Sequence, residues 1–188
     1  MSYARGASRK NVNYANKGKA LEDLVEYANK QYKAKGMALV QKISTPWTVK
    51  WQGTRIVSAF PSGQSTLDFR GTVAGGTSIS FDCKESADER GLPLAHIQEH
   101  QIEYMRTALG MGEVSFILAN IKPLDKYLLI DGDVVLAYWD RWKQNKGKRG
   151  FNLIPTESMQ EIKTGRGIAL DYLEGVQVCQ QRIQVGAD

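Results

Sequence analysis

Residues 65–84 read STLDFRGTVAGGTSISFDCK. Two β-favouring runs, 66–70 and 78–84, flank a segment that contains Gly75 and Gly76. Such runs, when a Gly-Gly pair separates them, are typical of a β-hairpin with a tight turn. We therefore expect two paired antiparallel strands here.

Charged side chains gather at one end of this predicted hairpin. Asp82 and Lys84 are two residues apart in a strand, so they point to the same face. The expected pairing brings Asp68 onto that face as well. Two carboxylates and one ammonium so placed can hold a divalent metal ion, with the backbone carbonyl of Cys83 as a further oxygen ligand. A surface cluster of salt bridges is the alternative interpretation.

A metal cluster of this kind supports hydrolysis by a metal-bound water. The carboxylates would neutralise the cation and orient the water. Lys84 would position or deprotonate that water, or stabilise the charge that develops on a phosphate. The Cys83 side chain points to the opposite face of the sheet, where we expect a small core residue.

An amphipathic helix is predicted N-terminal to this region, from Lys19 to about Lys35, where Gly36 follows as a stop signal. Glu22 lies on this helix, away from its apolar stripe. It can point at the same metal ion, or it can complement the helix dipole near the N-terminus.

The remaining elements predict a mixed α/β sheet flanked by helices. Residues 114–119 form a continuous apolar run, as expected of a buried central strand. The other expected elements are strands at 38–43 and 127–130, helices at 95–109, 134–142 and 157–163, and a last apolar segment at 168–173.

Residues 45–63 interrupt the sheet with an insertion that contains two tryptophans, Trp47 and Trp51. Proline near each end and alternating polarity favour an exposed hairpin rather than core. The two indoles would stack on unpaired nucleic-acid bases, or they would pack at an interface between two copies of the chain.

Composition excludes several classes of protein. The 188 residues include 42% hydrophobic and 24% charged side chains, as in ordinary globular domains. We find no apolar run long enough to span a membrane and no signal peptide. Two cysteines are too few for a disulfide framework, which fits a reducing cytoplasm. We expect a flexible basic arm at residues 1–15 and a single domain at 16–188.

Positive charge is concentrated in the first third of the chain. Residues 1–67 contain eleven Lys and Arg against three acids, whereas residues 68–188 contain fourteen against seventeen. This asymmetry indicates a polyanionic partner, although a solvated basic surface is the simpler alternative. The candidate DNA-binding residues are Lys17, Lys19, Lys42, Trp47, Lys50, Trp51, Arg55 and Arg70.

The order Glu on a helix, Asp on a strand, Asp-x-Lys on the next strand and Gln on a helix resembles the PD-(D/E)xK nuclease superfamily. Within it, the chain is similar to the RecU family of Holliday junction resolvases over about residues 14–142. The segments that carry this resemblance are YANKGKALED (14–23), STLDF (65–69), FDCKE (81–85), HQIEYM (100–105) and YWDR (138–141).

The resemblance implies a restriction-endonuclease-like fold and a set of catalytic positions. Asp68, Asp82 and Lys84 would be catalytic, with Glu22 as the helix carboxylate and Gln101 as the helix glutamine. Metal ligands would be Asp68, Asp82, Glu22 and the Cys83 carbonyl.

Two residues depart from the family pattern. Asp82 stands where many members have Glu, and Lys17 stands where Arg is usual.

The resemblance also implies an activity and its partners. The chain would be a Mg²⁺-dependent homodimer, with Mn²⁺ as a substitute and no small-molecule cofactor. It would cut two opposing strands of four-way junction DNA during recombination and repair. The insertion at 45–63 falls where the family has a protruding stalk.

Two other functions remain open. The chain would be a non-catalytic module that binds DNA junctions, or a nuclease that acts on ordinary duplex DNA. His96 and His100 are four residues apart on the predicted helix, and for them we expect partial exposure near DNA rather than a zinc site.

Overall fold

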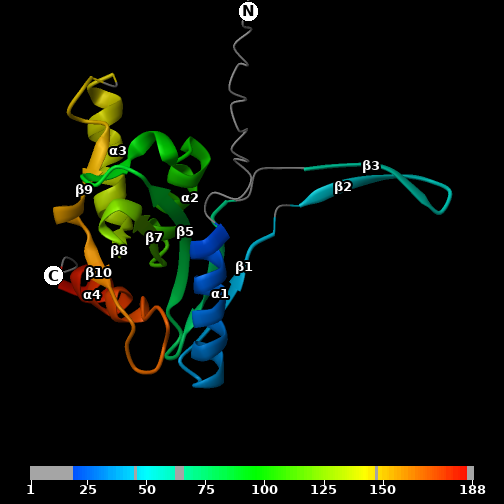
Figure 1. Cartoon of the computed structure of the whole chain (residues 1–188), viewed down its shortest axis with the longest axis horizontal. Helices are drawn as coiled ribbons and strands as arrows, with labels where there is room; N and C mark the ends of the chain where they lie inside the picture. Colours follow the sequence, from blue (N-terminus) through cyan, green and yellow to red (C-terminus); the bar gives the residue numbers. More distant parts are fainter. Residues whose placement is uncertain (1–18, 45, 62–65, 147, 186–188) are drawn as a thin grey trace, which may run out of the picture.

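A six-stranded mixed β-sheet lies at the centre of the structure, a computed structural model that describes residues 19–44, 46–61, 66–146 and 148–185. The strand order is β1-β4-β5-β7-β8-β10, and helices cover both faces (Figure 1). This arrangement confirms the predicted mixed sheet flanked by helices. The strands are β1 (Ala38–Lys42), β4 (Phe69–Val73), β5 (Ser78–Ser86), β7 (Val114–Ile121), β8 (Lys126–Asp131) and β10 (Gln160–Ile162).

The hairpin predicted from residues 65–84 is formed by β4 and β5, which pair antiparallel. Gly75 and Gly76 lie in its turn with φ of 96° and 97°, in the region that favours glycine. β5 then pairs with β7 in parallel. The predicted arm at residues 1–15 and Lys17 lie outside the described residues.

Each face of the sheet has its own apolar core, because side chains alternate along the strands. Phe116 and Leu118 of β7 pack with α1 (Lys19–Ala34) and α4 (Leu173–Val185). Ile117 and Ala119 of the same strand pack with α2 (Glu99–Gly110) and α3 (Gly132–Gln144). β7 is therefore buried on both sides, as its unbroken apolar sequence predicted.

The C-terminal part of the chain differs from the prediction. A helix at 157–163 was wrong: residues Thr156–Ser158 form a short 3-10 turn (η4), and β10 follows and pairs with β8. In β10 the exposed Glu161 precedes the buried Ile162, an alternation that suits a sheet edge. A helix, α4, starts at the end of the predicted apolar segment 168–173.

The helix predicted at 95–109 starts later, at Glu99. Residues Leu94–His96 form a separate 3-10 turn (η2), and Ile97 is extended with φ −98° and ψ 136°. Gln98 is also extended and caps α2.

Immediately before η2, β6 (Gly91–Pro93) pairs with β9 (Leu153–Pro155) in a small separate sheet.

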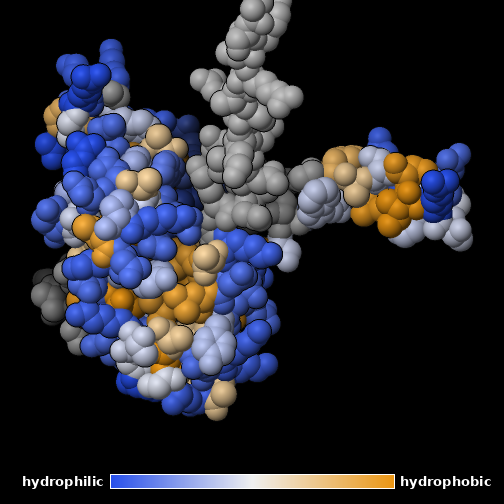
Figure 2. Space-filling model, viewed as in Figure 1, coloured by the Kyte–Doolittle hydropathy of each residue, from blue (hydrophilic) through white to orange (hydrophobic). Residues whose placement is uncertain are grey.

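The predicted insertion contains an antiparallel hairpin, β2 (Trp47–Gln52) and β3 (Arg55–Pro61), that projects from the body (Figure 1). Much of its surface is apolar (Figure 2). Trp47 and Trp51 are 59% and 61% exposed, so neither indole is a core residue. The hairpin is therefore an arm that presents aromatic side chains to its surroundings.

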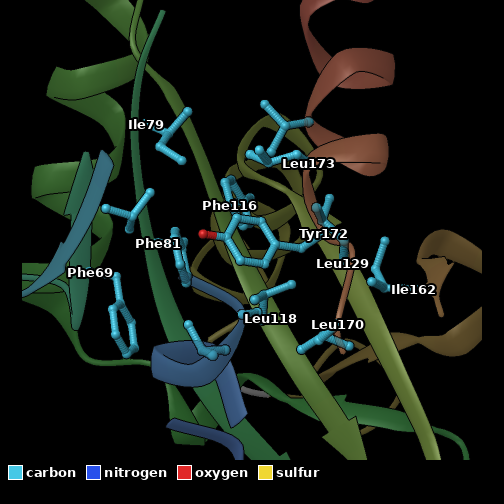
Figure 3. Close-up of a cluster of buried hydrophobic side chains, with 14 of the residues drawn as sticks. Phe69, Ile79, Phe81, Phe116, Leu118, Leu129, Ile162, Leu170, Tyr172 and Leu173 are labelled. Carbon is cyan, nitrogen blue, oxygen red and sulfur yellow. The ribbon is translucent and has the colours of Figure 1, made fainter. Parts of the chain in front are cut away.

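The core beneath α1 is built on a row of aromatic rings. Phe69, Phe81 and Phe116 stack across β4, β5 and β7 with centroid distances of 5.1 and 4.7 Å. Tyr172 packs against this row, 5.0 Å from the Phe81 centroid (Figure 3). Its hydroxyl donates to Asn29 Oδ1 at 2.5 Å, which ties the C-terminal segment to the buried side of α1.

A second buried contact fastens the same helix. The Tyr32 hydroxyl donates to Asp171 Oδ1 at 2.8 Å, and Arg166 donates to both oxygens of that carboxylate at 2.6 Å. Burial raises the pKa of Tyr32 far above its ordinary value, so this hydroxyl remains a donor. Helix α1, which carries Glu22, is thus fixed by residues about 140 positions later in the chain. No helix of the described part is long and apolar enough to cross a membrane.

We predict that Tyr172→Ala lowers the free energy of unfolding by about 3–5 kcal/mol, because it empties a fully buried aromatic site. Tyr172→Phe should cost about 1–2 kcal/mol, since Asn29 loses its buried donor. Tyr27→Ala serves as the control, because Tyr27 is 55% exposed on the same helix. Urea denaturation measures all three; equal losses for Tyr172→Ala and Tyr27→Ala would contradict the assigned packing.

Candidate active site

The strand register brings two carboxylates together. Phe69 pairs with Phe81, so Asp68, directly before β4, lies across from Asp82 on β5. Asp68 Oδ2 accepts a hydrogen bond from the Cys83 backbone N–H at 2.8 Å. The placement of Asp68 beside Asp82 therefore follows from the hairpin pairing that the sequence indicated, whereas their catalytic roles stay a prediction.

Asp82 is 1% exposed and has a different partner for each oxygen. Gln101 Nε2 donates to Oδ1 at 2.9 Å, and the Lys84 ammonium forms an ion pair with Oδ2. Within the described residues, Oδ2 accepts no hydrogen bond of regular geometry. The cation that faces this buried oxygen is therefore the Lys84 ammonium.

Gln101 is oriented by the start of helix α2. Its Oε1 accepts from the Gln98 backbone N–H at 3.1 Å, as part of the capping interaction at the helix N-terminus. With the oxygen so used, the Nε2 group faces Asp82. The helix start thus determines which end of the amide meets the carboxylate.

The pKa of Asp68 is raised to about 6, first by burial and then by the negative charge of Asp82. The hydrogen bond from Cys83 acts in the opposite direction. Two neighbouring carboxylates repel each other unless a proton or a cation lies between them. This repulsion is what a metal site of oxygen ligands relieves when it is filled.

Glu22 does not complete a three-carboxylate cluster. Its Oε2 lies 2.7 Å from Lys42 Nζ, and Lys42 also pairs with Glu26 at 3.1 Å. These contacts, first of all the one with Glu22, raise the pKa of Lys42 above its ordinary value. Among the described residues no three His, Cys, Asp or Glu side chains converge to hold a metal ion.

The donor set that remains fits Mg²⁺. It consists of Asp68, Asp82 and the backbone carbonyl of Cys83. Mg²⁺ is commonly held by one or two carboxylates and keeps several waters, so a small set of oxygen ligands suffices. The buried Asp82 Oδ2, whose partner is the Lys84 ammonium rather than a hydrogen-bond donor of regular geometry, and the raised pKa of Asp68 are the observations that support this fit.

Of the site residues, Asp68, Cys83 and Lys84 line a cleft of about 810 Å³, whereas the buried Asp82 is not among its lining residues. Asp68, Lys84 and Glu22 line it from the sheet and from α1. Gln98 and His96 line it from the start of α2 and from η2, and Lys122 lies at the end of β7. We did not single out Lys122 from the sequence, since its place depends on the parallel pairing of β5 with β7.

The predicted DNA-binding residues fall into two groups. Lys50 and Arg55 are exposed on the β2–β3 hairpin with Trp47 and Trp51. The others described are Lys19, exposed at the start of α1, Lys42, paired with Glu22, and Arg70, which is 57% exposed and 3.1 Å from Glu113 Oε2. The structure therefore does not bring all of these residues to one site.

Comparison with known proteins identifies the family. The model of the family described as Recombination protein U (RecU) matches residues 16–178. The chain belongs to this family. A relative from Oenococcus oeni is 27% identical over 91% of this chain and 89% of its own length, and one from Geobacillus kaustophilus is 30% identical over 88% and 82%. Both are named Holliday junction resolvase RecU.

A solved structure is also similar at a low level. A Holliday junction resolvase from Archaeoglobus fulgidus aligns over 62% of this chain and 74% of its own, with 16% identity and a TM-score of 0.36. The RecU assignment does not depend on this likeness, because the family model spans most of the chain.

We predict that Asp68→Asn stabilises the metal-free protein at pH 8 by about 1–3 kcal/mol, because it removes a carboxylate whose folded-state pKa lies above its ordinary value. The sign follows from linkage: the folded wild type holds a proton that the unfolded chain releases between about pH 4 and 6, so wild-type stability falls as pH rises through that window. The difference should vanish near pH 4. Asparagine can still accept the Cys83 hydrogen bond.

Urea denaturation in EDTA at pH 4 and pH 8 measures this difference. Asp125→Asn is the matched control, because Asp125 is exposed and the chemical change is the same. A stability gain that is equal at both pH values, or equal in the two variants, would contradict the assigned environment of Asp68.

Proposed function

We propose that this chain is a Mg²⁺-dependent endonuclease that resolves four-way DNA junctions in recombination and repair, acting as a homodimer. The observation that carries the proposal is the buried Asp82 between Lys84 and Gln101, beside an Asp68 that lines a cleft, in a member of the RecU family. Mn²⁺ would substitute for Mg²⁺, because both prefer oxygen ligands.

The proposed reaction is hydrolysis of one phosphodiester bond. Water attacks the phosphorus and one P–O ester bond breaks, which leaves one strand end with a phosphate and the other with a hydroxyl. A metal ion bound by Asp68, Asp82 and the Cys83 carbonyl would polarise the phosphate and make the water a better nucleophile.

The protein side chains would have separate tasks. Gln101 holds Oδ1 of Asp82, so that Oδ2 faces Lys84. The Lys84 ammonium would stabilise the negative charge that grows on the phosphate oxygens in the transition state. Glu22, paired with Lys42, would orient outer-sphere water rather than bind the metal directly.

The projecting hairpin would supply selectivity for a junction. Trp47 and Trp51 are more than half exposed, and stacking of an indole on an unpaired base contributes about 1–3 kcal/mol. Lys50 and Arg55 on the same arm would contact phosphates. An open crossover offers such bases, whereas regular duplex keeps its bases stacked.

Dimerisation would match the symmetry of the substrate. A four-way junction has two-fold symmetry, and an isologous dimer places two identical sites on strands of the same polarity. Two cuts made in this way would separate the joined duplexes.

We predict that Asp82→Asn lowers the rate of junction cutting about 100-fold or more, while the affinity for the junction stays within about twofold. Loss of a residue that hydrogen-bonds a metal ligand typically costs 10- to 100-fold in activity, and loss of the ligand itself should cost more. Asparagine preserves the acceptor for Gln101 but removes the ion pair with Lys84, so the folded state of the variant is checked by circular dichroism. The assay uses an end-labelled junction and the matching duplex, with Mg²⁺ or EDTA. Cutting at the wild-type rate would overturn the site.

The same assay separates the alternative functions. Paired nicks near the crossover, formed only with metal and only on the junction, support resolution. Metal-dependent cutting of junction and duplex alike would favour a general nuclease. Tight junction binding without cutting in Mg²⁺ or Mn²⁺ would favour the binding module.

We predict that Trp47→Ala combined with Trp51→Ala weakens junction binding by about 10- to 1000-fold, because two stacking contacts of about 1–3 kcal/mol are lost without full additivity. Leu39→Ala is the control, since Leu39 is 52% exposed but lies on β1 of the body. Binding to an open junction is measured by fluorescence anisotropy. The oligomeric state is measured in parallel, because a double variant that becomes monomeric would assign the two indoles to the dimer interface instead.

A further inference from the structure

The hollow that contains the candidate active site continues past the residues assigned to catalysis. A second hollow of about 580 Å³ shares Ser86, Ala87 and His96 with the active-site cleft and extends to Pro123. Because they share these lining residues, the two hollows form one groove. Lys122 lies on the active-site part of this groove, next to the part that leads away from Asp68.

Lys122 is held in place by a nearly buried carboxylate. Its Nζ lies 2.7 Å from Glu85 Oε2, and the Glu85 side chain is 10% exposed whereas that of Lys122 is 51% exposed. The fold explains the contact, since Glu85 pairs in register with Asn120 and Lys122 follows directly after β7. A lysine ammonium has three N–H donors, so the ion pair leaves donors for a second anion.

Of the two carboxylates that line the second hollow, one is neutralised by an arginine and the other is exposed, where water and salt screen its charge. Asp88 accepts two hydrogen bonds from the Arg90 side chain, at 2.9 and 2.7 Å, and is neutralised by it. Glu89 is a further acid there and is exposed. His96 contributes an exposed imidazole to both hollows, which is a further N–H donor.

The geometry points to a phosphate subsite at Lys122, assisted by His96, that holds the cleaved DNA strand on one side of the scissile phosphate. This inference rests on the proposed function, because it assigns the scissile phosphate to Asp68 and Asp82. The backbone phosphate that follows along the groove then meets the Lys122 ammonium, which Glu85 keeps at a defined place. Lys122 is thus a binding residue for the strand, whereas Lys84 faces the reacting group.

Lys122→Gln tests the subsite, with Lys126→Gln as its matched control. Lys126 is 46% exposed, pairs with Glu161 at 2.9 Å, and lines neither hollow, so each variant loses one positive charge and one ion pair with a glutamate, of which Glu161 is the more exposed. We expect Lys122→Gln to raise KM for the junction about tenfold, as for one hydrogen bond to a charged group, with kcat within about twofold. For Lys122→Gln, the logarithm of the binding constant should also fall less steeply with the logarithm of the salt concentration, by about 0.9 in slope.

Neutral methylphosphonate linkages in the substrate locate the contact. They are placed one at a time within three nucleotides on either side of the cleaved bond. At one of these positions the substitution should weaken binding by the wild type and by Lys126→Gln, yet leave binding by Lys122→Gln unchanged. Lys122→Arg should restore wild-type behaviour at that position, because the cationic charge is kept.

Two results would overturn the subsite while the proposed function stands. In the first, the wild type cuts the junction and Lys122→Gln behaves in every measurement as Lys126→Gln does. In the second, methylphosphonate at every position tested weakens binding by Lys122→Gln as much as it weakens binding by the wild type. Wild-type protein that cuts neither junction nor duplex in Mg²⁺ or Mn²⁺ overturns the proposed function itself, and the subsite with it.

Discussion

The antiparallel register of β4 and β5 is the constraint on which the candidate site depends. It sets Phe69 opposite Phe81 on one face of the sheet, and hence Asp68 opposite Asp82 on the other. A slip of one residue would exchange the two faces and move a carboxylate into the apolar core beneath α1. The stacked rings of Phe69, Phe81 and Phe116 make that slip costly, so packing on one face positions the chemistry on the other.

The site itself works against stability, and its surroundings offset the cost. Asp68 and Asp82 repel each other in a largely buried place, as the raised pKa of Asp68 shows. The Cys83 N–H, Lys84 and Gln101 each satisfy one carboxylate oxygen of this pair. Hairpin geometry and helix capping therefore hold two carboxylates together without a metal ion.

Local patterns predicted those parts of the fold that local contacts decide. Helix α1, strands β5 and β7 and the turn at Gly75 and Gly76 follow from periodicity and glycine placement. β10 could not be found in this way, because three residues become a strand only when β8 offers them an edge. The pairing of Glu22 with Lys42, the contact of Gln101 with Asp82 and the position of Lys122 likewise depend on contacts between distant segments.

The charges around the cleft connect metal binding with the approach of DNA. Three carboxylates, those of Glu22, Asp68 and Glu85, line the cleft with two ammonium groups, those of Lys84 and Lys122. The carboxylates outnumber the ammonium groups by one, so a phosphate meets net repulsion there when Asp68 is ionised. A bound divalent cation reverses the sign of this local charge. In a low-dielectric cleft such a reversal is large compared with thermal energy, so the metal ion that we propose would favour the entry of the scissile phosphate as well as its hydrolysis.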